Sequence, residues 1–238
     1  MINEEQKEAL RSLDLRAFLF DMDGVLYDSM PHHALAWIYA FQQVGIEYDK
    51  YGVYLHEGMT GDSTIEELYQ KVLKFKPTKE ECKRVYKMKA DYFESLGPAK
   101  EMPYAFSILS YLKEQNVDRF IVTGSGQQSL FNKLEHSFPG MFSRERMVTA
   151  FDVKKGKPDP EPYLMALQKG NLKPNQAIVV ENAPLGVRAG VAAGVFTIAV
   201  NTGILEKEDL LIEKPNMLYH SMYGLYEDLR EIIELARK

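Results

Sequence analysis

Residues 17–29 read AFLFDMDGVLYDS, and this stretch decides the fold. Residues 17–20 form a continuous apolar run that ends at a polar turn, which is typical of a strand buried on both faces of a parallel sheet. Three further apolar runs end in the same way, at residues 120–122 before TGSG, 177–180 before ENAP and 195–200 before NTG. Because helical patterns alternate with these runs, the sequence predicts an α/β fold with a doubly wound parallel sheet.

A region of different character follows the first predicted strand. Residues 30–97 contain no apolar run of the buried-strand type, but Pro31 can open a helix, and residues 63–66 and 78–81 both read as capping boxes. SLGPAKEMP, with two prolines and a glycine, reads as the linker that returns to the sheet. We therefore expect an α/β core made of residues 1–29 and 98–238, and a small all-helical cap domain made of residues 30–97.

The composition restricts the partners and the compartment. The chain has 29 Lys and Arg against 34 Asp and Glu, a net charge of −5, and no long basic run, so a nucleic-acid binder is not expected. Its one cysteine, Cys82, permits no intrachain disulfide, which favours a reducing compartment. The N-terminal stretch lacks the apolar core of a signal peptide, and no apolar run approaches the roughly 18 residues of a membrane span. We expect a cytoplasmic monomer with no membrane or nucleic-acid partner.

Two carboxylates follow the first predicted strand. Asp21 and Asp23 are two residues apart at the end of an extended segment, so their side chains lie on the same side. One carboxylate can attack or bind a metal while its neighbour handles protons, and Gly24 lets the chain turn sharply. The alternative is a surface turn with an acidic tip, which the preceding buried strand argues against.

The other predicted strands also end in residues that suit phosphate or metal. Thr123-Gly124-Ser125-Gly126 lets backbone N–H groups approach a phosphate, although such a turn alone is more often structural. Lys157 lies in a Pro-flanked loop, where most lysines are simply solvated. Glu181 and Asn182 offer a carboxylate and an amide oxygen, which suit Mg²⁺, although Asn182 could instead cap the next helix.

Together these segments resemble a known family. FDMDGVLYDS, IVTGSG, GKPDPEPY and VVENAPLGVRAG stand in the order of the four motifs of haloacid dehalogenase superfamily phosphotransferases, and the resemblance covers nearly the whole chain. More narrowly, DSMPHHALAW is similar to the segment after the first motif in the β-phosphoglucomutase branch. The resemblance implies a Rossmann-like core with a helical cap inserted after the first strand.

The resemblance also implies a role for each motif position. Asp21 would be the nucleophile that forms an aspartyl-phosphate, and Asp23 would act as the acid and base. Thr123 and Lys157 would hold the transferring phosphoryl group. The Mg²⁺ ligands would be Asp21, the backbone carbonyl of Asp23, Glu181 and Asn182. The substrate side would include Gly24, His33, Glu57, Gly124 and Ser125, with a structural histidine and a solvated loop acid as the alternatives for His33 and Glu57.

Two departures from the family bear on the reaction. Asn182 stands where the family often has Asp, so the site carries one negative charge fewer and should favour a more anionic substrate or intermediate. The cap arginine that grips a second phosphate in β-phosphoglucomutases is replaced by Gly61, although Lys87 or Lys89 could substitute for it. Without a bidentate arginine clamp, transfer to water is favoured. Glu57 could reach Mg²⁺ when the cap closes, which would suit a compact substrate.

The sequence therefore predicts a Mg²⁺-dependent phosphohydrolase for a small phosphorylated metabolite, such as a sugar phosphate, or for pyrophosphate. The alternative is a β-phosphoglucomutase that isomerises a sugar phosphate through a bisphosphate. A non-catalytic binding domain of the same fold is a remote alternative, because Asp21, Asp23, Lys157 and Glu181 are all present.

Overall fold

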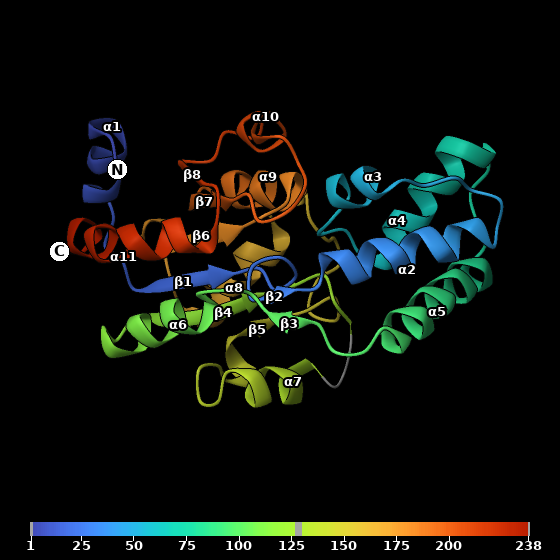
Figure 1. Cartoon of the computed structure of the whole chain (residues 1–238). Helices are drawn as coiled ribbons and strands as arrows, with labels where there is room; N and C mark the ends of the chain where they lie inside the picture. The colour runs from blue at the N-terminus through green and yellow to red at the C-terminus, as the bar shows by residue number, and fades with distance from the viewer. Residues whose placement is uncertain (1, 127–129, 238) are drawn as a thin grey trace.

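A computed structural model describes residues 2–126 and 130–237 of the chain, and a six-stranded sheet lies at the centre of its larger part (Figure 1). The strand order is β5-β4-β1-β6-β7-β8, and every pairing is parallel. The strands are β1 (Ala17–Phe20), β4 (Asp118–Val122), β5 (Met147–Val148), β6 (Ala177–Glu181), β7 (Phe196–Val200) and β8 (Met217–Tyr219). The predicted doubly wound parallel sheet is confirmed.

The sequence predicted the four longer strands and missed the short ones. β5 has two residues and β8 has three, which is too short for an apolar run or an alternation to stand out. A separate antiparallel ribbon of β2 (Tyr27–Asp28) and β3 (Lys100–Glu101) was also missed. β3 lies inside the segment that was read as a plain return linker, so the chain leaves and re-enters the core through paired strands.

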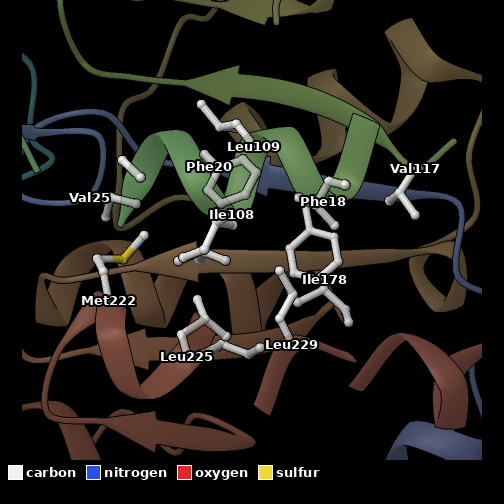
Figure 2. Close-up of a cluster of buried hydrophobic side chains, with 14 of the residues drawn as sticks. Phe18, Phe20, Val25, Ile108, Leu109, Val117, Ile178, Met222, Leu225 and Leu229 are labelled. Carbon is white, nitrogen blue, oxygen red and sulfur yellow. The ribbon is translucent and has the colours of Figure 1, made fainter. Parts of the chain in front are cut away.

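Helices cover both faces of the sheet. The apolar side chains of β1 point alternately to the two faces, so each face needs helices to bury them. Phe18 and Phe20 face α6 (Ala105–Glu114) and α11 (Met222–Ala236), as Figure 2 shows. Ala17 and Leu19 face α8 (Glu161–Gly170) and α9 (Pro184–Ala192). The remaining helices of the core are α1 (Glu4–Arg11), α7 (Leu130–Ser137), α10 (Lys207–Leu211) and the short 3₁₀ turns Arg144–Arg146 and Pro174–Gln176. Within the two described ranges, no helix is both long and apolar enough to span a bilayer.

A second, helical part lies between β2 and β3, and we call it the helical insert (Figure 1). It consists of α2 (Met30–Gln42), α3 (Lys50–Leu55), α4 (Gly61–Leu68) with its π-helical extension Tyr69–Leu73, and α5 (Lys79–Ser95). Pro31 lies in the first turn of α2, as predicted. The insert has its own buried cluster, which includes Trp37, Ile65 and Val85. The domain division at residues 30 and 97 stays a prediction, although all these helices fall within it.

One of the two predicted capping boxes is confirmed and the other is wrong. Thr78 and Glu81 form the expected reciprocal pair at the start of α5, with the Thr78 N–H donating to Glu81 Oε2 at 2.7 Å. α4 begins at Gly61, two residues before the predicted cap Ser63. Thr60 caps this helix by accepting the Ser63 N–H at 3.3 Å. Thr60 is an equally good capping residue and lies earlier in the chain, so Ser63 falls inside the helix.

Candidate active site

The parallel register brings the predicted motif residues to one edge of the sheet. Phe20 of β1 lies opposite Ile121 of β4 on one side and opposite Val180 of β6 on the other. Asp21 and Glu181, which follow directly, therefore meet at the carboxyl ends of neighbouring strands, where open α/β sheets place their ligands.

Lys157 lies at the centre of this edge and is buried. Its Nζ donates to Asp21 Oδ1 and to Glu181 Oε1, both at 2.5 Å. The hydroxyl of Tyr163 also donates to Glu181 Oε1, at 2.6 Å, and the N–H of Asn182 donates to Glu181 Oε2 at 3.1 Å. Both oxygens of Glu181, a predicted metal ligand, are therefore engaged by protein groups, and its role as a ligand stays a prediction.

The buried charges of this cluster do not balance. Burial disfavours the ammonium of Lys157, but Asp21 and Glu181 outweigh burial and hold the pKa of Lys157 above its ordinary value. Burial raises the pKa of Asp21 to about 8, and the Glu181 and Asp23 carboxylates raise it against the opposing effect of Lys157. One ammonium is too little positive charge for the carboxyl groups gathered here, so the cluster favours a further cation or a proton.

Asp23 is held from the side of the helical insert. Ser29 Oγ donates to Asp23 Oδ1 at 2.5 Å, and His33 Nε2 lies 3.1 Å from the same oxygen. Lys89 Nζ lies 2.9 Å from His33 Nδ1, so the ammonium is the donor and the ring proton sits on Nε2, facing Asp23. Burial alone would raise the pKa of Asp23, but His33, Ser29 and Lys89 outweigh burial and hold that pKa below its usual range.

Lys89 is the cation that the insert contributes, and it is buried on α5. Its Nζ lies 4.9 Å from the ring centroid of Phe93, 5.5 Å from that of Trp37 and 5.9 Å from that of Tyr86. Aromatic faces attract an ammonium, which allows it to stay charged there. Burial nevertheless lowers the pKa of Lys89 to about 8.

A cavity of about 90 Å³ lies between the sheet edge and the insert. Seven of the predicted site residues line it, namely Asp21, Asp23, His33, Glu57, Thr123, Gly124 and Ser125. The residues that the sequence did not single out include Tyr48, His56, Met59 and Tyr86, and no local pattern could have identified them because they come from separate parts of the insert. Among the described lining residues, the other predicted site residues Lys157, Glu181, Asn182 and Gly24 are not included.

The two lysines proposed as substitutes for an arginine separate in the structure. Lys89 lines the cavity, whereas Lys87 is exposed and pairs with Asp91 at 2.7 Å. At Gly61, a Cβ atom would lie 2.3 Å from the ring of Tyr86. The Tyr86 ring thus occupies the space into which a longer side chain at Gly61 would extend.

Glycines allow close approach at two points of the site. Gly24 has φ +85°, and a Cβ atom there would lie 2.1 Å from Asn182 Nδ2, so a side chain would displace Asn182. At Gly124 a Cβ atom would lie 3.1 Å from the carbonyl oxygen of Gly58. The turn at residues 123–126, which could approach a phosphate, therefore lies directly against the insert. Thr123 braces that loop by accepting the Ser125 N–H at 3.1 Å.

Glu57 of the insert reaches the core. Asn182 Nδ2 donates to Glu57 Oε2 at 2.9 Å, so Asn182 does not cap the helix that follows it. The other oxygens of this pair, Glu57 Oε1 and Asn182 Oδ1, are buried and have no hydrogen-bond partner among the described residues. Burial, together with the nearby Asp21 and Glu181 carboxyls, raises the pKa of Glu57 well above its ordinary value.

These unpaired oxygens bear on metal binding. No three His, Cys, Asp or Glu side chains in the described ranges form a ready-made metal cluster. The available donors are of mixed kind: a carboxylate of Asp21, the backbone carbonyl of Asp23, the unpaired amide oxygen of Asn182 and the unpaired carboxyl oxygen of Glu57. Such an all-oxygen set with few protein ligands is what Mg²⁺ prefers.

Comparison with known proteins gives consistent relatives. The profile of the family "Haloacid dehalogenase-like hydrolase" matches residues 18–200. "Hexitol phosphatase A" of Escherichia coli is 33% identical over 207 residues, which cover 83% of this chain and 90% of that protein. "Beta-phosphoglucomutase" of Bacillus subtilis is 27% identical over 79% of this chain and 84% of its own length. A solved structure described as "Putative beta-phosphoglucomutase from Bacteroides vulgatus" is 46% identical, with a TM-score of 0.95 over 99% of this chain and 100% of that chain.

Proposed function

Since the chain belongs to the haloacid dehalogenase-like hydrolase family, we propose that it hydrolyses a small phosphate compound through a phosphorylated Asp21. That the chain is a phosphohydrolase or phosphomutase follows from its relatives, which confirm the resemblance drawn from the four motifs. The observation that carries the proposal is the position of Asp21. Its carboxyl lines the cavity, is held by Lys157 at 2.5 Å, and lies beside a second carboxyl, Asp23.

The proposed reaction has two steps. In the first, an oxygen of Asp21 bonds to phosphorus, the bond from phosphorus to the leaving oxygen breaks, and Asp23 gives that oxygen a proton. In the second, water attacks the phosphorus, Asp23 takes the proton of the water, and the bond from Asp21 to phosphorus breaks. Acid–base help of this kind contributes about 10²–10⁴-fold to such rates. The low pKa of Asp23 favours the carboxylate that the second step needs, so the first step has to proceed from the less populated, protonated form of Asp23.

We propose Mg²⁺ as the cofactor, held by Asp21, the Asp23 carbonyl, Glu181 and Asn182, as the motifs predicted, with Glu57 as a further ligand from the insert. The two unpaired buried oxygens and the excess of carboxyl groups support this assignment. When bound, Mg²⁺ would supply the positive charge that lets an anionic carboxylate approach an anionic phosphate. Glu181 would also hold Lys157 in position by accepting the hydrogen bond from its Nζ.

Hydrolysis is favoured over mutase chemistry by the shape of the cavity. Tyr86 fills the space beside Gly61, so no bidentate clamp for a second phosphate stands there. The Glu57–Asn182 contact joins the insert to the core beside a cavity of only about 90 Å³. Relatives named for hexitol, carbohydrate and other phosphatases support a sugar phosphate as the substrate class, and pyrophosphate fits the same compact site.

Mutase activity remains the second candidate because of Lys89. This buried lysine of the insert lines the cavity and could hold the distal phosphate of a bisphosphate with a single ammonium charge, without the bidentate geometry of a guanidinium. The helical insert would act as a cap in either case, opening for the substrate and closing for the reaction.

A phosphate-release assay over sugar phosphates and pyrophosphate, with Mg²⁺ or with EDTA, tests the proposal. We expect metal-dependent release of phosphate from at least one of these compounds. A parallel reaction with β-glucose 1-phosphate and a glucose bisphosphate primer tests the second candidate. Isomerisation with little free phosphate would contradict hydrolysis and establish the mutase.

A further inference from the structure

The loop that follows β7 is tied to the turn that carries Asp23. Thr202 Oγ1 donates to the backbone carbonyl of Gly24 at 2.6 Å. The loop is also closed on itself, because Asn201 Nδ2 donates to the Leu205 carbonyl at 2.8 Å. The end of β7 and the turn after Asp23 therefore form one connected unit.

The same loop packs against α3 of the insert. Leu205 is 6% exposed and belongs to the buried cluster of the insert, whose other buried members all lie between Met30 and Val85. A Cβ atom at Gly203 would lie 2.6 Å from the Tyr54 ring, so this ring rests on the loop backbone. Just beyond the loop, Asp209 of α10 accepts a hydrogen bond from the hydroxyl of Tyr51.

Both tyrosines lie close to Glu57. Tyr51 and Tyr54 are three residues apart on α3, so they share one face of the helix, and Glu57 follows two residues after α3 ends. A contact that fixes this face also fixes the segment from which Glu57 reaches Asn182.

We propose that residues 202–209 form a latch that holds the helical insert on the core and positions both Glu57 and Asp23. Leu205 and Asp209 act on Glu57 through α3, and Thr202 acts on Asp23 through the Gly24 carbonyl. They are positioning residues, since none of them is part of the described cavity lining. The effect of the latch on turnover rests on the proposed function, whereas its effect on closure does not.

Closure has a built-in reporter. Trp37 is the only tryptophan in the chain, lies 9% exposed in the insert and lines the cavity. Opening of the insert would expose it, so quenching of its fluorescence by acrylamide measures closure without substrate.

The closure arm of the test uses Tyr51→Phe and Leu205→Ala, with Leu205→Met as the conservative variant. We expect quenching of Trp37 to rise about twofold or more, and KM to rise about threefold for Tyr51→Phe and about tenfold for Leu205→Ala, because only the closed fraction binds productively. In Leu205→Met, Trp37 quenching and KM should both stay near their wild-type values. Tyr219→Phe is the matched control, since it removes a tyrosine–aspartate hydrogen bond at 3.1 Å within the core.

The Asp23 arm uses Thr202→Val, which keeps the shape and removes the hydroxyl. We expect kcat to fall about tenfold, with KM and Trp37 quenching near wild type. The insert still closes, but the turn that carries Asp23 loses the hydrogen bond to its Gly24 carbonyl. Unchanged quenching in folded Tyr51→Phe, or in folded Leu205→Ala, would overturn the closure role, and unchanged kcat in Thr202→Val would overturn the Asp23 role. If no compound releases phosphate, the proposed function fails while the quenching series still decides the latch.

Discussion

Asn182 Nδ2 donates to Glu57 Oε2 at 2.9 Å, and this contact joins the core to the helical insert across the candidate site. The two residues compensate for each other. Asn182 lacks the negative charge that an aspartate would bring, and Glu57 brings a carboxyl to the same place. Because Glu57 belongs to the insert, the oxygen set that we propose for Mg²⁺ would be complete only while the insert lies on the core.

Removing the charge of Glu57 should therefore weaken metal use. Glu57→Gln keeps an acceptor for Asn182 but removes the carboxylate, so we expect the Mg²⁺ concentration for half-maximal rate to rise about tenfold. A magnesium titration of the phosphate-release rate measures this. Glu80→Gln is the control, because this glutamate lies in the first turn of α5 with its side chain 84% exposed. An unchanged titration curve in Glu57→Gln would show that Glu57 does not serve the metal.

If Lys89 binds the substrate, its pKa predicts how substrate binding depends on pH. Burial lowers this pKa to about 8, so the ammonium is present below pH 8 and is lost as the pH rises above it. If Lys89 holds an anionic substrate, KM should rise by up to about tenfold per pH unit above 8, a range in which the substrate phosphate is already fully ionised. Steady-state kinetics from pH 6.5 to 9.5 measure this trend.

Lys89→Met is the matched variant for that profile. It should show a raised KM that changes less between pH 7 and 9 than in the wild type, since Lys89 no longer titrates while Asp21, with a pKa of about 8, still does. A wild-type KM that stays flat across this range would exclude Lys89 from substrate binding.

The buried ion pairs of Lys157 make a prediction about stability. Lys157→Met leaves Asp21 and Glu181 without their shared partner, so we expect a loss of about 3 kcal/mol in the free energy of unfolding. Urea denaturation measures it, with Lys155→Met as the control because Lys155 is exposed. Equal stability of the two variants would mean that the carboxyls take up protons at little cost.

Much of the core could be predicted from the sequence, because its strands are continuous apolar runs. The run at 17–20 predicted β1 to the residue, and the four motifs predicted which side chains meet at the sheet edge. The short strand β5 carries no such signal, and the helix start at Thr60 competed with Ser63, which has the same chemistry.

The insert side of the site was harder to predict. Lys87 and Lys89 are two residues apart on one helix, and only the packing of α5 on α2 decides which of them faces the cavity. The contact of Glu57 with Asn182 joins residues that are far apart in the chain, so no local pattern could contain it. Tyr48 and Tyr86 were missed for the same reason.

Asp21 is the residue that we propose carries the phosphoryl group. The most direct measurement is a rapid acid quench of the enzyme during turnover with its best phosphate substrate and Mg²⁺, followed by peptide mass spectrometry. We expect one phosphoryl group on the peptide that contains Asp21. Asp21→Asn should show neither this adduct nor turnover, while Asp118→Asn, at the half-buried start of β4, should keep both. Turnover at the wild-type rate in Asp21→Asn, or an adduct on a different residue, would contradict it.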